Sequence, residues 1–249
     1  MNRCGVFDSG VGGLSVAKEL LRAGFFKEII YFGDTARVPY GNKNESTIIR
    51  YSLEALEFLK NFDIEFLVVA CNSASSVAIE ELKKEASFPV VGVIEAGVKA
   101  VEKEDKNSNI LLVGTKRTIN SGKYQNLLLK KGFKNIFSKA TPLFVPLVEE
   151  GFVEGKLVDD VFEIYFSDIK KENIDIIILG CTHYPFLSSS FKKHFPNAKL
   201  IHSGQAIVEL LKEQYNLLPK FDSTIKLFAS DNPEELRIKA KEWLNFSLI

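Results

Sequence analysis

Short apolar segments alternate along this chain with longer stretches in which apolar residues recur at helical spacing. The short segments are rich in Val, Ile and Phe. Such alternation favours parallel strands joined by crossover helices, so the pattern predicts an α/β fold. Two segments, FLVVAC at 66–71 and IIILGC at 176–181, are apolar throughout. Continuous apolar runs are typical of strands buried on both faces of a sheet.

The same pattern predicts individual elements. Strands are expected at 4–8, 28–33, 65–71, 90–94, 109–114, 135–138, 175–181, 199–202 and 224–229. Helices are expected at 14–21, 46–61, 75–85, 122–131, 159–172, 207–215 and, at the end of the chain, 231–244.

The length of 249 residues fits either one large domain or two small ones. A charged stretch at 99–108 favours a boundary near residue 95. The final strand precedes only one helix, which is too little for a separate domain, so we expect it to rejoin the first sheet. The expected domains are residues 1–94 with 205–249, and residues 95–204.

The composition narrows the class of function. Lys and Arg together number 32, as do Asp and Glu, so the chain lacks the basic excess that binding to nucleic acids or anionic membranes usually requires. Hydrophobic residues make up 46% of the chain, which excludes a disordered protein. No apolar run approaches the length of a membrane span, and the N-terminus has no signal-peptide layout. We therefore expect a cytoplasmic protein that acts on a small molecule, with neither nucleic acid nor membrane as a partner.

Two cysteines stand where a predicted buried strand ends and a helix begins, Cys71 in the first half and Cys181 in the second. The carboxyl ends of parallel strands form the edge at which open α/β sheets bind ligands. Backbone N–H groups at a helix start attract anions, which predicts a lowered pKa for both thiols. The matching contexts favour a functional pair over two small buried hydrophobic residues. Polar residues follow each cysteine: Asn72 and Ser73 after the first, Thr182 and His183 after the second.

Other uses of the thiols fit the sequence less well. An odd count of three cysteines argues against a disulfide framework. Zinc needs three or four ligands with short pair spacings, and Cys181 with His183 is the only close pair, so we expect no metal site. Nucleophilic catalysis of the papain type would use one Cys with His183 and leave the second Cys unexplained. Cys4 lies inside the first strand, where we expect it to pack in the core.

A glycine-rich turn follows the first strand, in GVFDSGVGG at 5–13. Its glycines do not match the spacing of G-x-G-x-x-G, and it lacks the G-K-[ST] of a P-loop. Asp8 and Ser9 end the strand, and we expect them to point at the same sheet edge as Cys71. The alternative role for Asp8 is a simple helix N-cap.

Two polar loops offer further candidates. GDTARVPYG at 33–41 is either a plain turn or a wall facing a substrate, and it ends in Pro39, Tyr40 and Gly41. GTKRTINSG at 114–122 places Thr115 and Thr118 at a helix start, where their hydroxyls either cap the helix or hold a carboxylate.

Seven segments together carry a resemblance over nearly the whole chain. In order and with similar spacing, they resemble the glutamate racemase family, the cofactor-independent enzymes of the aspartate/glutamate racemase superfamily. The segments are GVFDSGVGGLSV, GDTARVPYG, ACNSAS, VGVIEAG, GTKRTI, FVPLVEEG and GCTHYP. The resemblance implies two similar doubly wound α/β domains with mainly parallel sheets, related by a pseudo-twofold axis, with the active site between them.

The resemblance also assigns roles to residues of this chain. It implies that Cys71 and Cys181 are the catalytic pair, assisted by Asp8 and His183, with Glu149 near His183. The positions implied to hold the polar groups of the amino acid are Ser9, Pro39, Tyr40, Gly41, Asn72, Ser73, Thr118 and Thr182. Ser73 departs from the family, which commonly has Thr there, but the hydroxyl is kept.

The implied activity is the interconversion of L- and D-glutamate, which supplies D-glutamate for peptidoglycan, with no pyridoxal phosphate and no metal. Racemisation removes the Cα proton from one face and returns a proton to the other, so two acid/base groups must flank a planar carbanion. Two thiols on opposing domains fit that need. A homodimer is compatible with the sequence, which does not decide the oligomeric state.

Three alternatives stay open beside this interpretation. Aspartate racemase, or another superfamily member such as a hydantoin racemase, would share the two cysteines and differ in the pocket for the side chain. A non-catalytic amino-acid-binding protein would be expected to lack at least one of the two. A nucleotide-binding enzyme would need a phosphate motif, and none is intact here.

Overall fold

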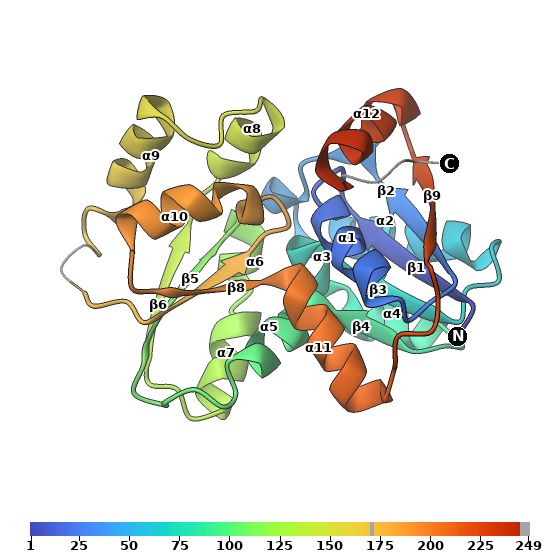
Figure 1. Cartoon of the computed structure of the whole chain (residues 1–249), viewed down its shortest axis with the longest axis horizontal. Coiled ribbons are helices and arrows are strands. Elements are labelled where there is room, and N and C mark those ends of the chain that lie inside the picture. Colours follow the sequence, from blue (N-terminus) through green and yellow to red (C-terminus); the bar gives the residue numbers. More distant parts are fainter. Residues whose placement is uncertain (170–171, 245–249) are drawn as a thin grey trace.

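The computed structural model describes residues 1–169 and 172–244. Its strands are β1 (Arg3–Asp8), β2 (Glu28–Gly33), β3 (Phe66–Val69), β4 (Val90–Gly92), β5 (Asn109–Gly114), β6 (Asn135–Ala140), β7 (Ile176–Gly180), β8 (Lys199–His202) and β9 (Thr224–Ala229). They form two sheets, in the orders β4-β3-β1-β2-β9 and β6-β5-β7-β8, and all pairings are parallel. Figure 1 shows the two sheets side by side, the first on the right and the second on the left. The expected α/β class with two sheets is confirmed.

Helices connect these strands. The α-helices are α1 (Leu14–Ala23), α2 (Glu45–Lys60), α3 (Asn72–Val77), α4 (Ile79–Glu85), α5 (Val93–Ala100), α6 (Lys116–Asn120), α7 (Lys123–Lys130), α8 (Phe144–Glu149), α9 (Lys156–Phe166), α10 (Ser188–His194), α11 (Ser203–Tyr215) and α12 (Pro233–Leu244). Short 3₁₀ helices are η1 (Thr35–Arg37), η2 (Tyr40–Asn42) and η3 (Tyr184–Leu187). Among the described residues, no helix combines the length and the apolar character needed to cross a membrane.

Several boundaries differ from the sequence expectation. The strand expected at 90–94 ends at Gly92, and α5 begins at Val93 within the same apolar run. Both segments are buried, so hydrophobicity does not mark the point where the strand ends. The helix expected at 75–85 begins earlier, at Asn72, and is interrupted at Ala78.

The helix expected at 159–172 is displaced towards the N-terminus. It begins at Lys156 and ends at Phe166, and the expected positions 170 and 171 lie outside the described residues. The sequence pattern did not reveal α5, α8 and α10, and of α6 it indicated only the start at Thr115. These helices have eight residues or fewer, which is too short for a helical period to be visible.

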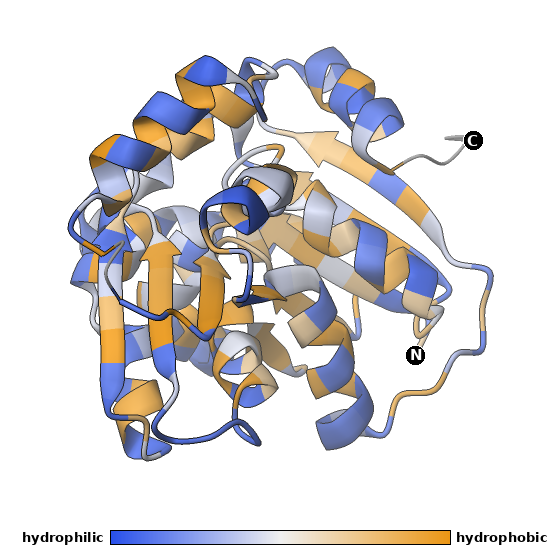
Figure 2. Ribbon diagram, turned by 60° about the vertical axis from the view of Figure 1, so that its left-hand side comes forward, coloured by the Kyte–Doolittle hydropathy of each residue, from blue (hydrophilic) through white to orange (hydrophobic). Residues whose placement is uncertain are grey.

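The first sheet is covered on both faces, as its apolar strands require. Successive residues of a strand point to opposite faces. Cys4 and Val6 belong to the core that includes α1 and α11, whereas Phe7 packs in a second core with α2 and α4. Cys4 is thus a buried core residue, as expected. In Figure 2 the strands are mostly hydrophobic and the covering helices are hydrophobic on one side only.

The second sheet packs against an aromatic cluster beneath α8, α9 and α10. The Phe162 ring is fully buried, with its centroid 4.7 Å from that of Phe144 and 4.9 Å from that of Phe191. On the other side, α5 contacts α7 and the strands β7 and β8. Both sheets are therefore buried on both faces, which explains the continuous apolar runs.

The chain passes from one sheet to the other within two helices that pack against each other, α5 and α11. After α11 it returns to the first sheet, where β9 pairs with β2. The expected domain limits at 94/95 and 204/205 fall inside these two helices. The division into domains itself stays a prediction.

Each sheet contains one point where the strand order reverses. In the first, β1 lies between β2 and β3; in the second, β5 lies between β6 and β7. In open α/β sheets the crevice at the carboxyl ends of such strands is the usual ligand site. The topology therefore provides two crevices, one between β1 and β3 and one between β5 and β7.

The aromatic cluster yields a stability prediction. Phe162→Ala should lower the free energy of unfolding by about 3–5 kcal/mol, because it leaves a cavity in a tightly packed core. Ile164→Ala, on the same helix, removes a side chain that is 70% exposed and should change it by less than about 0.5 kcal/mol. Urea denaturation of both variants measures the free energy of unfolding. An equal decrease in the two variants would contradict the assigned packing.

Candidate active site

The two crevices open onto one small cavity between the sheets. Its volume is about 30 Å³, which is room for about one water molecule. The lining residues come from both halves of the chain: Ser9, Val38, Pro39, Tyr40, Gly41, Cys71, Asn72, Ser73, Thr115, Val145, Glu149, Cys181, Thr182 and His183.

Most residues singled out from the sequence therefore lie together. Asp8 and Thr118 are fully buried and stand behind the lining residues. The sequence did not single out Val38 or Val145, which are ordinary apolar residues and carry no local signal. Thr115 was considered only as one of two hydroxyls at a helix start, and the structure places it on the cavity wall.

Cys71 follows β3 and occupies the N-cap of α3. Its Sγ accepts a hydrogen bond from the backbone N–H of Ala74 at 3.5 Å, and its thiol donates to Ser9 Oγ at 3.4 Å. Burial raises the pKa of this thiol to about 12, and the negative charge of Asp8 contributes in the same direction. The expected lowering of the Cys71 pKa is therefore wrong, because loss of hydration outweighs the bonds from the helix start and Ser9.

Cys181 follows β7 and has a different partner. Its Sγ lies 3.7 Å from His183 Nδ1, and His183 Nε2 lies 3.0 Å from Glu149 Oε1. Burial by itself lowers the pKa of His183, but the contacts with Cys181 and Glu149 outweigh it and raise the value to about 10. The ring is therefore protonated at neutral pH and links the thiol to the carboxylate.

Asp8 is fully buried at the end of β1. Its carboxylate accepts hydrogen bonds from the backbone N–H of Gly10 at 3.0 Å and from the Thr182 hydroxyl at 3.4 Å. Burial raises the pKa of Asp8, and the charge of His183 opposes this rise. The N-cap of α1 is Gly13, so the alternative role of Asp8 as a simple helix cap is not observed.

The glycine-rich turn after β1 serves a close approach between the two halves. A Cβ at Gly12 would lie 2.4 Å from Thr182 Oγ1 and 2.5 Å from the His183 ring. No side chain fits in that space. This contact accounts for a glycine in a turn that matches no phosphate-binding motif.

Hydrogen bonds join the two halves across the cavity. Ser73 Oγ lies 2.9 Å from Thr115 Oγ1, which in turn caps α6 and lies 3.1 Å from Thr118 Oγ1. The Tyr124 hydroxyl donates to Asn72 Oδ1 at 2.9 Å. Tyr124 is a buried residue of α7 and was not singled out from the sequence.

A wider cavity of about 310 Å³ adjoins the small one. The two share Val38, Pro39, Gly41, Thr115, Val145 and Glu149 in their walls. The shared residues therefore separate the acid/base groups from an outer vestibule.

The arrangement suits proton transfer on two sides of one small molecule. Cys71 with Asp8 and Ser9 forms one group, and Cys181 with His183 and Glu149 forms the other. Across residues 1–169 and 172–244, no cluster of three or more His, Cys, Asp or Glu side chains has an arrangement that could hold a metal ion.

Comparisons with known proteins agree with this site. A profile of the Asp/Glu/Hydantoin racemase family matches residues 16–211. The glutamate racemase of a Nitratiruptor species is 56% identical over 246 residues, covering 97% of this chain and 96% of that protein. The crystal structure of the Campylobacter jejuni glutamate racemase has a TM-score of 0.96 and 51% identity, covering 99% of this chain and 100% of that one. A Francisella tularensis glutamate racemase, solved in complex with D-glutamate, has a TM-score of 0.88 and 35% identity, with coverage of 100% and 95%.

The His183–Glu149 pair yields a pH prediction. Because the folded pKa of His183 lies above its ordinary 6.5, the protonated ring contributes stability that is fully present below pH 6.5 and is lost as the pH rises through about 10. Glu149→Gln removes the negative charge that favours the protonated ring and should lower the pKa of His183. Glu150→Gln, an exposed neighbour, should leave it unchanged. NMR titration of the histidine rings measures the pKa of His183, whose signal is assigned with His183→Asn. The same His183 pKa in both Gln variants would refute the pairing.

Proposed function

Since this chain belongs to the Asp/Glu/Hydantoin racemase family, we propose that it is a glutamate racemase that interconverts L- and D-glutamate by a two-base, two-cysteine mechanism. The observation that carries this proposal is the pair of thiols on one cavity, each at the carboxyl edge of a different sheet. Two such groups flank a bound amino acid, as proton exchange at opposite faces of Cα requires. The high identity to glutamate racemases over nearly the whole chain supports glutamate as the substrate.

The reaction proceeds through a carbanion at Cα. The thiolate of Cys71 takes the Cα proton of D-glutamate and becomes a thiol, while the thiol of Cys181 gives its proton to the opposite face and becomes a thiolate. The product is L-glutamate, and the reverse reaction exchanges the two roles. The preference of each thiol for one enantiomer rests on the family resemblance.

The neighbours of each thiol set its protonation state before the next turnover. Asp8, whose pKa burial raises, is suited to accept the Cys71 proton before D-glutamate reacts. His183, whose pKa lies at about 10, is suited to return a proton to Cys181. Glu149 holds the His183 ring in place through Nε2. These roles make Asp8 and His183 the assisting residues, and Glu149 supports His183.

Polar groups around the cavity hold the amino acid. We assign this task to the hydroxyls of Ser9, Ser73, Thr115 and Thr182, the amide of Asn72, and the wall formed by Pro39, Tyr40 and Gly41. Thr118 lies behind the wall and acts through its contact with the Thr115 hydroxyl. Hydrogen-bond donors aimed at the α-carboxylate stabilise the charge that develops at Cα, and their effect is strong where water is excluded. No pyridoxal phosphate is needed as an electron sink in such a site.

Substrate entry requires the cavity to widen. Glutamate has ten non-hydrogen atoms and does not fit in about 30 Å³. We propose that the two halves of the chain separate to admit glutamate and close over it, with the loop 38–41 staying fixed to the first half, which excludes water from the carbanion.

We place this activity in the cytoplasm, where it supplies D-glutamate for peptidoglycan. The bacterial origin of the similar glutamate racemases supports this role.

The first test measures racemisation directly. Purified protein with L- or D-glutamate should produce the other enantiomer, followed by circular dichroism or chiral chromatography, without added cofactor. Activity should survive both a chelator and a carbonyl reagent. A requirement for pyridoxal phosphate would refute the mechanism, and faster turnover of aspartate than of glutamate would refute the substrate.

The second test separates the two thiols. Cys71→Ser and Cys181→Ser should each lower racemisation by at least about 10³-fold, because a hydroxyl is far too weakly acidic to replace the thiol. With a glutamate analogue that carries a leaving group at Cβ, Cys71→Ser should keep elimination from the L-like isomer and Cys181→Ser from the D-like one. Cys4→Ser changes a core residue outside the site, so the fraction of this variant that folds should retain racemase activity. The reverse pattern of elimination would exchange the two assignments, and near-normal racemisation by either active-site variant would refute the two-base mechanism.

A further inference from the structure

A buried carboxylate lies next to the site without lining the cavity. Asp34 directly follows β2, is fully buried, and was not singled out from the sequence. Its backbone N–H donates to the carbonyl oxygen of Asp8 at 3.0 Å. Asp34 therefore lies next to Asp8, at the end of β1.

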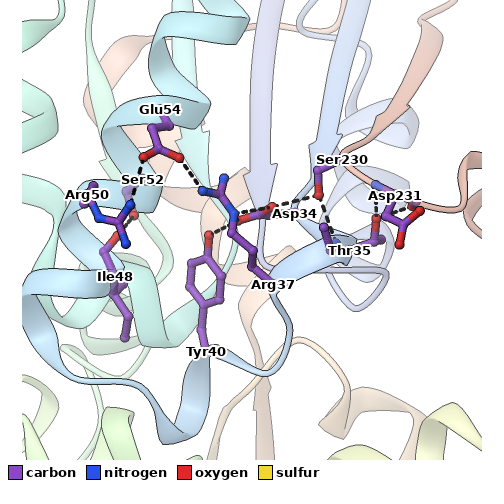
Figure 3. A network of polar contacts seen from close by, with 11 residues as sticks. Asp34, Thr35, Arg37, Tyr40, Ile48, Arg50, Ser52, Glu54, Ser230 and Asp231 are labelled. Carbon is purple, nitrogen blue, oxygen red and sulfur yellow. Dashed lines mark hydrogen bonds and ion pairs between the residues drawn. The ribbon is translucent and has the colours of Figure 1, made fainter.

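Three side chains donate to this one carboxylate, as Figure 3 shows. The Tyr40 hydroxyl donates to Oδ2 at 2.5 Å, and Ser230 Oγ donates to Oδ1 at 2.8 Å. Arg37 Nε donates to Oδ1 at 2.9 Å and lies 2.7 Å from Oδ2. The first two come from the loop that follows β2, and Ser230 comes from the end of β9. The carboxylate thus joins both ends of the loop and ties it to the last strand of the sheet.

The Tyr40 side chain is buried, and both its ring and its hydroxyl contact other side chains. Its side chain is 1% exposed, its ring centroid lies 5.8 Å from that of Tyr51, and Arg37 lies 4.0 Å above the Tyr51 ring. Burial raises the pKa of Tyr40, and the hydrogen bond to Asp34 adds to this rise. The hydroxyl is therefore neutral and committed to Asp34, so Tyr40 cannot donate that proton to a substrate.

The position of this loop sets the width of the site. Residues 38–41 line both the small cavity and, except for Tyr40, the vestibule. A Cβ at Gly41 would lie 2.8 Å from Cβ of Thr115, on the opposite wall. A small displacement of the loop therefore changes the contact across the cavity.

We propose that Asp34 is a positioning residue that fixes the loop 38–41 through the Tyr40 hydroxyl and thereby sets the affinity for the substrate. The role rests on the proposed function, because it assigns the loop to substrate binding. Asp34 acts through Tyr40 and takes no part in proton transfer at Cα. Ser230 extends the same anchor to the C-terminal strand, and Arg37 extends it to Glu54 on α2.

Kinetics of Asp34→Asn and Tyr40→Phe test this role. Each substitution should raise KM roughly tenfold, the loss expected when a hydrogen bond to a charged group is weakened or removed. The rise should be equal for both enantiomers, because the same wall contacts either one. The value of kcat should change by less than about threefold, because binding is weakened equally in the ground and transition states.

A double variant separates action through Tyr40 from an independent role. In Asp34→Asn/Tyr40→Phe the KM should be no higher than in the more affected single variant, since both substitutions break one connection. Additive effects would overturn the proposal. An unchanged KM in both single variants would also overturn it. So would a lower kcat in Asp34→Asn together with the loss of one limb of its pH–rate profile, because that result would identify Asp34 as an acid/base group. Asp160→Asn, a matched change in a surface ion pair with Lys156, should leave KM and kcat unchanged.

Hydrogen exchange gives a reading that does not depend on activity. Amides of residues 40–43 should exchange at least severalfold faster in Tyr40→Phe and Asp34→Asn than in Asp160→Asn. Unchanged exchange would show that Asp34 does not hold the loop. An inactive wild-type protein with faster exchange in the two loop variants would refute the proposed function while keeping Asp34 as the anchor. Tyr40→Phe keeps the test decisive if Asp34→Asn does not fold.

Discussion

The carboxyl edges of the two sheets approach each other so closely that at one point only a glycine fits between them. A Cβ at Gly12 would lie 2.4 Å from Thr182 Oγ1 and 2.5 Å from the His183 ring. This contact brings the end of β1 against the turn that follows β7, and it leaves a cavity of only about 30 Å³. The other properties of the site depend on it, because groups that would each face water on a single sheet are buried here against one another.

Exclusion of water affects the charged groups in opposite ways. For Cys71 and Asp8, burial favours the neutral, protonated form and raises both pKa values. For His183, burial alone favours the neutral ring, but its bonds to Cys181 and Glu149 prevail, and the ring keeps its proton. Cys71 and His183 therefore hold protons at neutral pH. A site that delivers a proton to a substrate needs protonated groups next to it.

The scaffold repeats, but the chemistry around each thiol does not. Both sheets reverse their strand order beside a central strand, and each places a cysteine after the neighbouring strand. Cys71 meets a hydroxyl and the field of a carboxylate, whereas Cys181 meets an imidazole. A repeated fold provides two opposed faces around one small molecule, and different partners allow the two faces to differ in their readiness to give or take a proton.

The sequence by itself determined the α/β class, the run that contains each strand, and the position of Cys71 and Cys181 at strand ends. These are local properties, because apolar periodicity and the residue after a strand can be read within a few positions. Short helices such as α6 lacked enough residues to show a period. Only the tertiary structure decided that Tyr124 bonds Asn72, that Thr115 rather than Thr118 reaches the cavity wall, that Asp34 anchors Tyr40, and that the Cys71 pKa rises. Each of these four features depends on contacts between residues that are distant in the sequence, and on the exclusion of water where those residues pack together.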